Sequence, residues 1–106
     1  MKIDELALCL EKLGHPNRLE IFRLLVRAGP DGLPVGNVQR YLGIPASTLT
    51  HHIAQLVSAD LVRQTREGRV LRCTADYERM DDIMGALTAE CCSGVPEMEQ
   101  GIASDG

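Results

Sequence analysis

The segment Pro45–Leu56 constrains the fold of this chain more than any other stretch. When this segment is drawn as a helix, Leu49, Ile53 and Leu56 fall on one side, together with Val57, the residue that follows the segment. The opposite side carries no Lys and no Glu, and consists of Ser47, Thr48, His51, Gln55 and Ser58. The apolar stripe predicts a helix that packs on a core. The short donors and acceptors of the other face are suited to base edges in a DNA major groove.

The segments before this helix are separated by helix breakers. Helical spacing predicts helices over residues 3–13 and 16–27, with a break at 14–17 between them. The dense Gly and Pro cluster of residues 28–34 predicts a loop. A short helix over about 35–42 then ends at Gly43, and the helix that opens at Pro45 runs to about Ala59. A short helix, a tight turn and a second helix with a polar outer face form the helix-turn-helix pattern.

The segments after this helix predict a wing and a last helix. Residues 61–65 and 69–74 flank Arg66-Glu67-Gly68 and predict a β-hairpin with a basic tip. From Asp76, helical spacing of Tyr77, Met80, Met84, Leu87 and Cys91 predicts a final amphipathic helix over residues 76–91. The expected fold class is mainly α with a small β-hairpin wing, a winged helix-turn-helix of five helices.

Length and charge fit one small DNA-binding domain. With 106 residues and 44% hydrophobic content the chain can form one core, and an obligate dimer would help to bury its apolar surface. Residues 40–75 carry five arginines against two acids, a net charge of +3, whereas residues 76–106 carry one arginine against eight acids, a net charge of −7. Phosphate binding needs only such a local positive patch. We expect the winged domain to span residues 1–92 and residues 93–106 to form an acidic, disordered tail.

No apolar stretch approaches the length of a membrane span, and the start of the chain lacks a signal-peptide pattern. The expected location is therefore the cytoplasm, with no membrane partner. There the four cysteines would be reduced, which makes them candidate ligands or sensors. The sequence contains no nucleophile–base–orienter set and no Gly-rich phosphate loop, so we do not expect an enzyme.

The order of elements and three stretches resemble the ArsR/SmtB family of bacterial winged helix-turn-helix repressors. Cys73 before the last helix and the vicinal pair Cys91 and Cys92 at its end resemble the arsenical-responsive branch of that family. The three stretches are residues 13–21 at the start of the second helix, 47–56 in the recognition helix and 59–62 before the wing. In the last of these, Asp60 stands where the family usually has Gly. The resemblance implies a homodimer that occupies double-stranded operator DNA and leaves it when an inducer binds.

The resemblance and the helical wheel together indicate the residues that contact DNA. Ser47, Thr50 and His51 match family positions that touch bases or phosphates, and the wheel centres the exposed face near His51. His52 is as consistent with helix packing as with a contact. Arg18 is expected to pair with an acid, and Arg63 and Arg72 to be solvated strand residues. The complete expected DNA-binding set is Ser47, Thr48, Thr50, His51, His52, Gln55, Arg66 and Arg69.

The resemblance also directs attention to the cysteines. Residues 35–41 lack the Cys-x-Cys pair of the family's arsenic site, and no His follows residue 52 to complete its zinc site. The remaining candidate ligands for a thiophilic metal or metalloid are Cys73, Cys91 and Cys92. A helix over 76–91 spans roughly 24 Å, so one subunit cannot unite them. Antiparallel packing of the last helices, which the resemblance implies, would place Cys73 of one chain near Cys91 and Cys92 of the other.

The resulting hypothesis is a repressor released by arsenite, methylarsenite or antimonite, with no required cofactor. Cys9 is expected to be a buried small side chain, and the alternative is a spare ligand, if the first helix lies near the last one in the dimer. One alternative keeps the fold and makes Cys73 and Cys91 a redox or persulfide-sensing pair. Another is a winged-helix module for protein contacts without an inducer.

Overall fold

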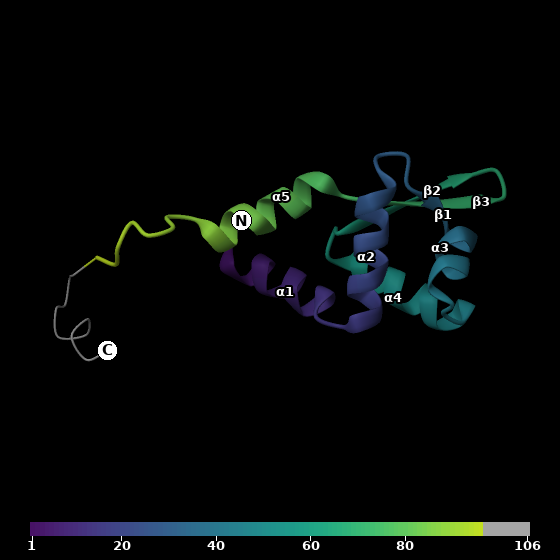
Figure 1. The fold of residues 1–106 in the computed structure, drawn as a ribbon, viewed down its shortest axis with the longest axis horizontal. Coiled ribbons are helices and arrows are strands. Elements are labelled where there is room, and N and C mark those ends of the chain that lie inside the picture. The colour runs from purple at the N-terminus through teal and green to yellow at the C-terminus, as the bar shows by residue number, and fades with distance from the viewer. Residues whose placement is uncertain (97–106) are drawn as a thin grey trace.

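A computed structural model of the chain describes residues 1–96 and has the expected winged helix-turn-helix architecture (Figure 1). Residues 97–106, most of the expected acidic tail, lie outside the described part. The elements are α1 Ile3–Leu13, α2 Pro16–Ala28, β1 Leu33–Pro34, α3 Val35–Leu42, α4 Ala46–Ser58, β2 Val62–Glu67, β3 Val70–Ala75 and α5 Tyr77–Thr88. No helix in this part is long and apolar enough to cross a membrane.

The wing is a three-stranded antiparallel sheet in the order β1-β3-β2. The predicted hairpin is confirmed, with Val62 opposite Ala75 and Glu67 opposite Val70. Its turn is residues 68–69, so the prediction that Arg66-Glu67-Gly68 lies between the strands was wrong, because Arg66 and Glu67 pair with Leu71 and Val70 in the sheet. The prediction that residues 28–34 form only a loop was wrong at its end, because Leu33 and Pro34 pair with Cys73 and Arg72 of β3. A strand of two residues has no periodicity to reveal it, and Pro34 is tolerated because the strand lies at the sheet edge.

Local signals account for several helix ends. Pro16 occupies the first turn of α2, and the Nδ1 atom of His15 accepts a hydrogen bond from the Asn17 backbone N–H at 3.1 Å. Gly43 ends α3 in the left-handed conformation at φ 65°. A carboxylate oxygen of Asp76 accepts a hydrogen bond from the Arg79 backbone N–H at 2.9 Å and caps α5.

The core lies where α2 packs against α4 and β3. The predicted apolar face of α4 is confirmed, because Leu49, Ile53 and Leu56 are each at most 1% exposed. Asp60, at the α4–β2 junction, has φ 59°. This left-handed conformation favours Gly, and Asp is among the few other residues that tolerate it.

The last helix is shorter than predicted. α5 ends at Thr88, and Ala89 has an extended ψ of 133°. Glu90 and Cys92 have positive φ values of 57° and 62°. Helical stability in a small protein comes mainly from packing of an apolar face. Leu87 is 55% exposed, so packing against the core does not stabilise further helical turns after Thr88. Cys91 therefore does not extend the Leu87 stripe.

We expect Gly32→Ala to destabilise the fold by at least about 3 kcal/mol. Gly32 has φ 63°, and an added Cβ would overlap the Cys73 carbonyl oxygen and lie 2.5 Å from Cγ2 of Thr74. Gly68→Ala is the matched control, because Gly68 has φ 64° and open space around its Cβ position; it should cost only about 1 kcal/mol. Urea unfolding followed by circular dichroism measures both, and equal losses would contradict the close approach at Gly32.

Candidate nucleic-acid interface

The outward face of α4 carries most of the expected reading residues. Ser47, Thr50 and His51 are exposed, and Thr48 is half-buried. The Thr50 hydroxyl donates a hydrogen bond to the Ala46 carbonyl oxygen at 2.9 Å, which leaves its oxygen free to accept one. This face therefore presents small hydroxyl groups around one imidazole, as a helix that enters a groove requires.

Gln55 reaches the same face but is already partnered. Its Oε1 atom accepts a hydrogen bond from Nζ of Lys12 at 2.6 Å, and both side chains are half-buried. Sequence reasoning missed Lys12, because nothing in the spacing of the first helix indicates that its last turn meets α4. The bond places a positive charge beside a helix that has no charged residue of its own.

The wing supplies exposed cations at its tip. Arg66 lies near the end of β2 and Arg69 lies in the turn; both are exposed, and within residues 1–96 neither donates a side-chain hydrogen bond. Arg63 differs, because its guanidinium lies 2.9 Å from a carboxylate oxygen of Asp76. Arg72 lies 2.9 Å from a Glu67 carboxylate oxygen. Within residues 1–96 the side chains of Arg66 and Arg69 are thus unpaired, and their contact with phosphates stays a prediction.

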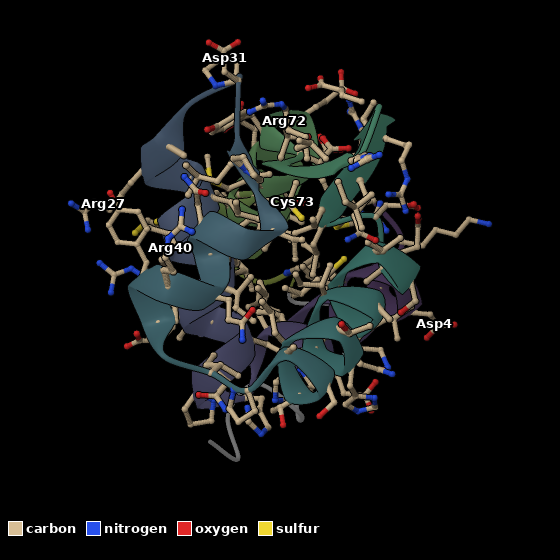
Figure 2. The ribbon with its side chains drawn as sticks, turned by 90° about the vertical axis from the view of Figure 1, so that its right-hand side faces the viewer. Asp4, Arg27, Asp31, Arg40, Arg72 and Cys73 are labelled. Atoms are coloured by element: carbon tan, nitrogen blue, oxygen red, sulfur yellow. The ribbon has the colours of Figure 1, made fainter. Side chains whose placement is uncertain are left out.

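Arg72 and Arg18 both donate hydrogen bonds to backbone carbonyl groups of the domain. Arg72 also donates to the carbonyl oxygen of Asp31, in the loop before β1, at 3.1 Å (Figure 2). The Nε atom of Arg18 donates to the Lys12 carbonyl oxygen at 2.7 Å. Arg18 has the structural role that the sequence suggested, but its partner is the C-terminal end of α1 rather than an acid.

His52 does not lie on the exposed face. Its side chain is buried at 6% exposure, its ring centroid lies 4.5 Å from that of His15, and its Nδ1 atom has no hydrogen-bond partner in residues 1–96. Burial lowers the pKa of His52, and the positive charge of Arg18 and the neighbouring His15 and His51 lower it further. Of the two interpretations of His52, this position fits helix packing and not base contact.

The candidate ligand Cys73 is also buried. Its side chain is 0% exposed within the sheet, and Figure 2 places it in the interior of the domain. Burial raises the pKa of the Cys73 thiol, although a hydrogen bond from Nε2 of Gln64 to Sγ, at 3.6 Å, opposes part of that effect. Since the thiolate is the form that binds metals and acts as a nucleophile, Cys73 is a poor ligand in this conformation.

Cys91 and Cys92, unlike Cys73, are accessible to solvent. Both are exposed and free, and their sulfur atoms lie 3.5 Å apart in the turn that follows α5. Within residues 1–96 no three His, Cys, Asp or Glu side chains are grouped to hold one metal ion, so a single chain does not unite Cys73 with this pair. Cys9 is buried as expected, and its thiol donates to the Ala59 carbonyl oxygen at 3.8 Å.

We expect the free energy of unfolding to fall as the pH drops below about 6.5. In that range His52 is protonated in the unfolded chain, whereas burial keeps it neutral in the folded protein. The lowered pKa means that the unfolded chain binds more protons in that range, so the stabilisation is present above the unfolded pKa and lost below it. Urea midpoints between pH 7.5 and 5 measure the effect. His52→Leu should flatten this dependence and His51→Leu should retain it; the reverse result would contradict the assignment.

Comparisons with known proteins agree with this geometry. The helix-turn-helix domain family model matches residues 13–65. The HTH-type transcriptional regulator YgaV of Escherichia coli is 26% identical over 84% of this chain and 88% of its own. The solved transcriptional repressor BigR of Xylella fastidiosa is 25% identical, with a TM-score of 0.66 over 84% of this chain and 88% of that one.

An ArsR-like transcriptional regulator of Rhodococcus sp. RHA1 shares the fold with a TM-score of 0.73 at 20% identity, over 96% of this chain and 90% of that one. The chain belongs to the helix-turn-helix domain family and has the winged-helix fold of ArsR-family transcriptional regulators.

Proposed function

We propose that the protein is a transcriptional repressor that binds operator DNA as a homodimer through α4 and the β2–β3 wing, and leaves it when a trivalent arsenical or antimonite binds cysteine thiolates. The DNA-binding part of this proposal rests on the side chains exposed at one end of the molecule. There, α4 exposes hydroxyls and an imidazole, and the wing tip adds two unpaired arginines. α4 and the wing lie together at this end, whereas the acidic α5 extends toward the other (Figure 1).

Exposed apolar side chains on α1 and α5 support a dimer. The two helices lie side by side in Figure 1 and contact each other. Their large exposed apolar residues are Ile3, Leu8, Leu10, Met84 and Leu87. A contiguous apolar surface on a small domain marks an interaction site. A second copy packed there would carry a second α4, and a pseudo-palindromic operator would then meet two recognition helices.

The exposed pair Cys91–Cys92 supports the inducer. Two thiol sulfurs 3.5 Å apart can together replace two ligands of a trivalent arsenic or antimony centre, releasing their protons as the two As–S or Sb–S bonds form. Cys73 of the partner would have to leave a fully buried position to become a third ligand. The proposal therefore depends first on Cys91 and Cys92, and a two-thiolate site suits a monomethylated arsenical best.

The same pair is less suited to the redox alternative. Adjacent Cα atoms are about 3.8 Å apart across a trans peptide, which is below the usual span of about 4.4–6.8 Å in disulfides. A Cys91–Cys92 disulfide would thus be strained, whereas a bridging arsenic atom relieves the short span. The Cys73–Cys91 pair of the redox hypothesis would join a buried thiol to an exposed one. Mass spectrometry after peroxide or a sulfide donor distinguishes the mechanisms, because only the redox alternative leaves a disulfide or polysulfide.

We expect Arg66→Gln/Arg69→Gln to weaken binding to every DNA sequence. The plot of the logarithm of the association constant against the logarithm of the salt concentration should become less steep by roughly 2, because two phosphate contacts are lost. His51→Ala should instead weaken binding most for the preferred sequence. Fluorescence anisotropy at several salt concentrations, on duplexes selected by the protein from a random pool, measures both effects. Arg63→Gln is the control, since Arg63 is paired with Asp76. Failure to bind any duplex would support a module for protein contacts.

Addition of methylarsenite or arsenite to the protein–operator complex should release the DNA, and Cys91→Ser/Cys92→Ser should abolish release while leaving binding to DNA unchanged. The reason is that the metalloid needs both exposed thiolates and neither lies on the DNA-binding end. Ser93→Ala is the matched control, at an exposed side chain next to the pair that carries no thiol. Cys73→Ser tests the third ligand: it should impair the response to arsenite more than to methylarsenite. Release that persists in the double variant would end the sensing hypothesis.

A further inference from the structure

A cavity between α2 and α5 plays no part in DNA binding or in the cysteine site. Its volume is about 350 Å³, within the range of about 300–1,000 Å³ typical of small-molecule sites. Seven of its nine lining residues are apolar and the other two are arginines. The complete lining is Leu13, Leu19, Phe22, Arg23, Val26, Arg27, Met80, Ile83 and Met84.

The floor and the rim of this cavity differ in chemistry. Phe22 and Ile83 are each 5% exposed and form a floor that belongs to the core, whereas Met84 is 59% exposed at the rim. Arg23 and Arg27 lie one helical turn apart on the same face of α2. The side chain of Arg27 points outward from the helix in Figure 2. The cavity thus combines a hydrocarbon surface with two cations on one edge.

The two arginines have no anion of their own in the described chain. Neither Arg23 nor Arg27 forms an ion pair or a side-chain hydrogen bond within residues 1–96, in contrast to Arg63, Arg72 and Arg79. Glu20 lies on α2 close to Arg23 in sequence, but it does not line this cavity. A pair of neighbouring guanidiniums beside an apolar surface is complementary to a carboxylate attached to a hydrocarbon chain.

We propose that this cavity binds a small amphipathic anion, a free monocarboxylate with a short hydrocarbon chain. The hydrocarbon part lies on Phe22, Val26 and Ile83, and the carboxylate accepts hydrogen bonds from Arg23 and Arg27. The side chains of Met80 and Met84 come from α5 and close the opposite wall. Unbranched thioether side chains adapt to ligands of varied shape, which suits such a wall. The proposal is independent of the arsenical hypothesis.

Octanoate is the test ligand, and the methionine methyl groups report its position. In full-length protein labelled with ¹³C at the methionine methyls, octanoate should shift the Met80 and Met84 signals saturably and leave the Met1 signal unchanged, because Met1 does not line the cavity. Octan-1-ol, which keeps the chain and lacks the charge, should bind about tenfold more weakly or worse. Signals of Met80 and Met84 that do not respond to octanoate would overturn the proposal.

Matched double variants separate a specific carboxylate site from general attraction. Arg23→Gln/Arg27→Gln should weaken octanoate by about tenfold or more and leave octan-1-ol unchanged. Arg66→Gln/Arg69→Gln removes the same charge at the wing and should leave octanoate binding unchanged. Equal losses in the two variants, or equal affinities for octanoate and octan-1-ol, would contradict recognition by Arg23 and Arg27. Because Met84 also lies on the proposed dimer surface, Met80 decides between a ligand and a second copy. A Met80 signal that responds to protein concentration and not to octanoate would show that a second copy covers the cavity, which also overturns the proposal.

Discussion

The C-terminal end of α4 is held at one carbonyl group, and the position of this helix, which we propose reads DNA, depends on it. The Ala59 carbonyl oxygen accepts a hydrogen bond from Nε of Arg79 at 3.1 Å and one from the Cys9 thiol at 3.8 Å. Arg79 belongs to α5 and Cys9 to α1, so both outer helices meet the end of α4 at this point. Arg79 also pairs with Glu5 of α1 at 3.4 Å. Unpaired carbonyls at a helix end need such donors when they are buried.

This junction explains how an inducer at the far end of the molecule could affect DNA binding. Cys91 and Cys92 follow α5, and one link from that helix to the end of α4 is the hydrogen bond from Arg79 to Ala59. A second link joins α1 to α4 through Lys12 and Gln55. Coupling requires that the ligand binds two arrangements of these helices with different affinity. The hydrogen bonds at Ala59 and Gln55 are the contacts that such arrangements would exchange.

α4 and its neighbouring elements supply different kinds of groups to the proposed DNA-binding surface. α4 has no Asp, Glu, Lys or Arg, so its side chains contribute hydrogen-bonding groups and no formal charge. The cations come from Arg66 and Arg69 on the wing and from Lys12 at the end of α1. A chain with a net charge of −4 can therefore present a local positive surface, because its acids are concentrated after residue 75.

The amino-acid sequence by itself determined the helices, the hairpin and the outer face of α4, because periodic burial and turn residues act over a few neighbouring positions. It also identified Arg66 and Arg69, which lie at a turn that any hairpin with this register would expose. Only the tertiary structure decided that His52 and Cys73 are buried, that Leu33–Pro34 pairs with β3, and that α5 stops at Thr88. The physical reason is that burial at these positions is set by partners distant in sequence: His52 meets His15, and Cys73 lies between Leu33 and Gln64.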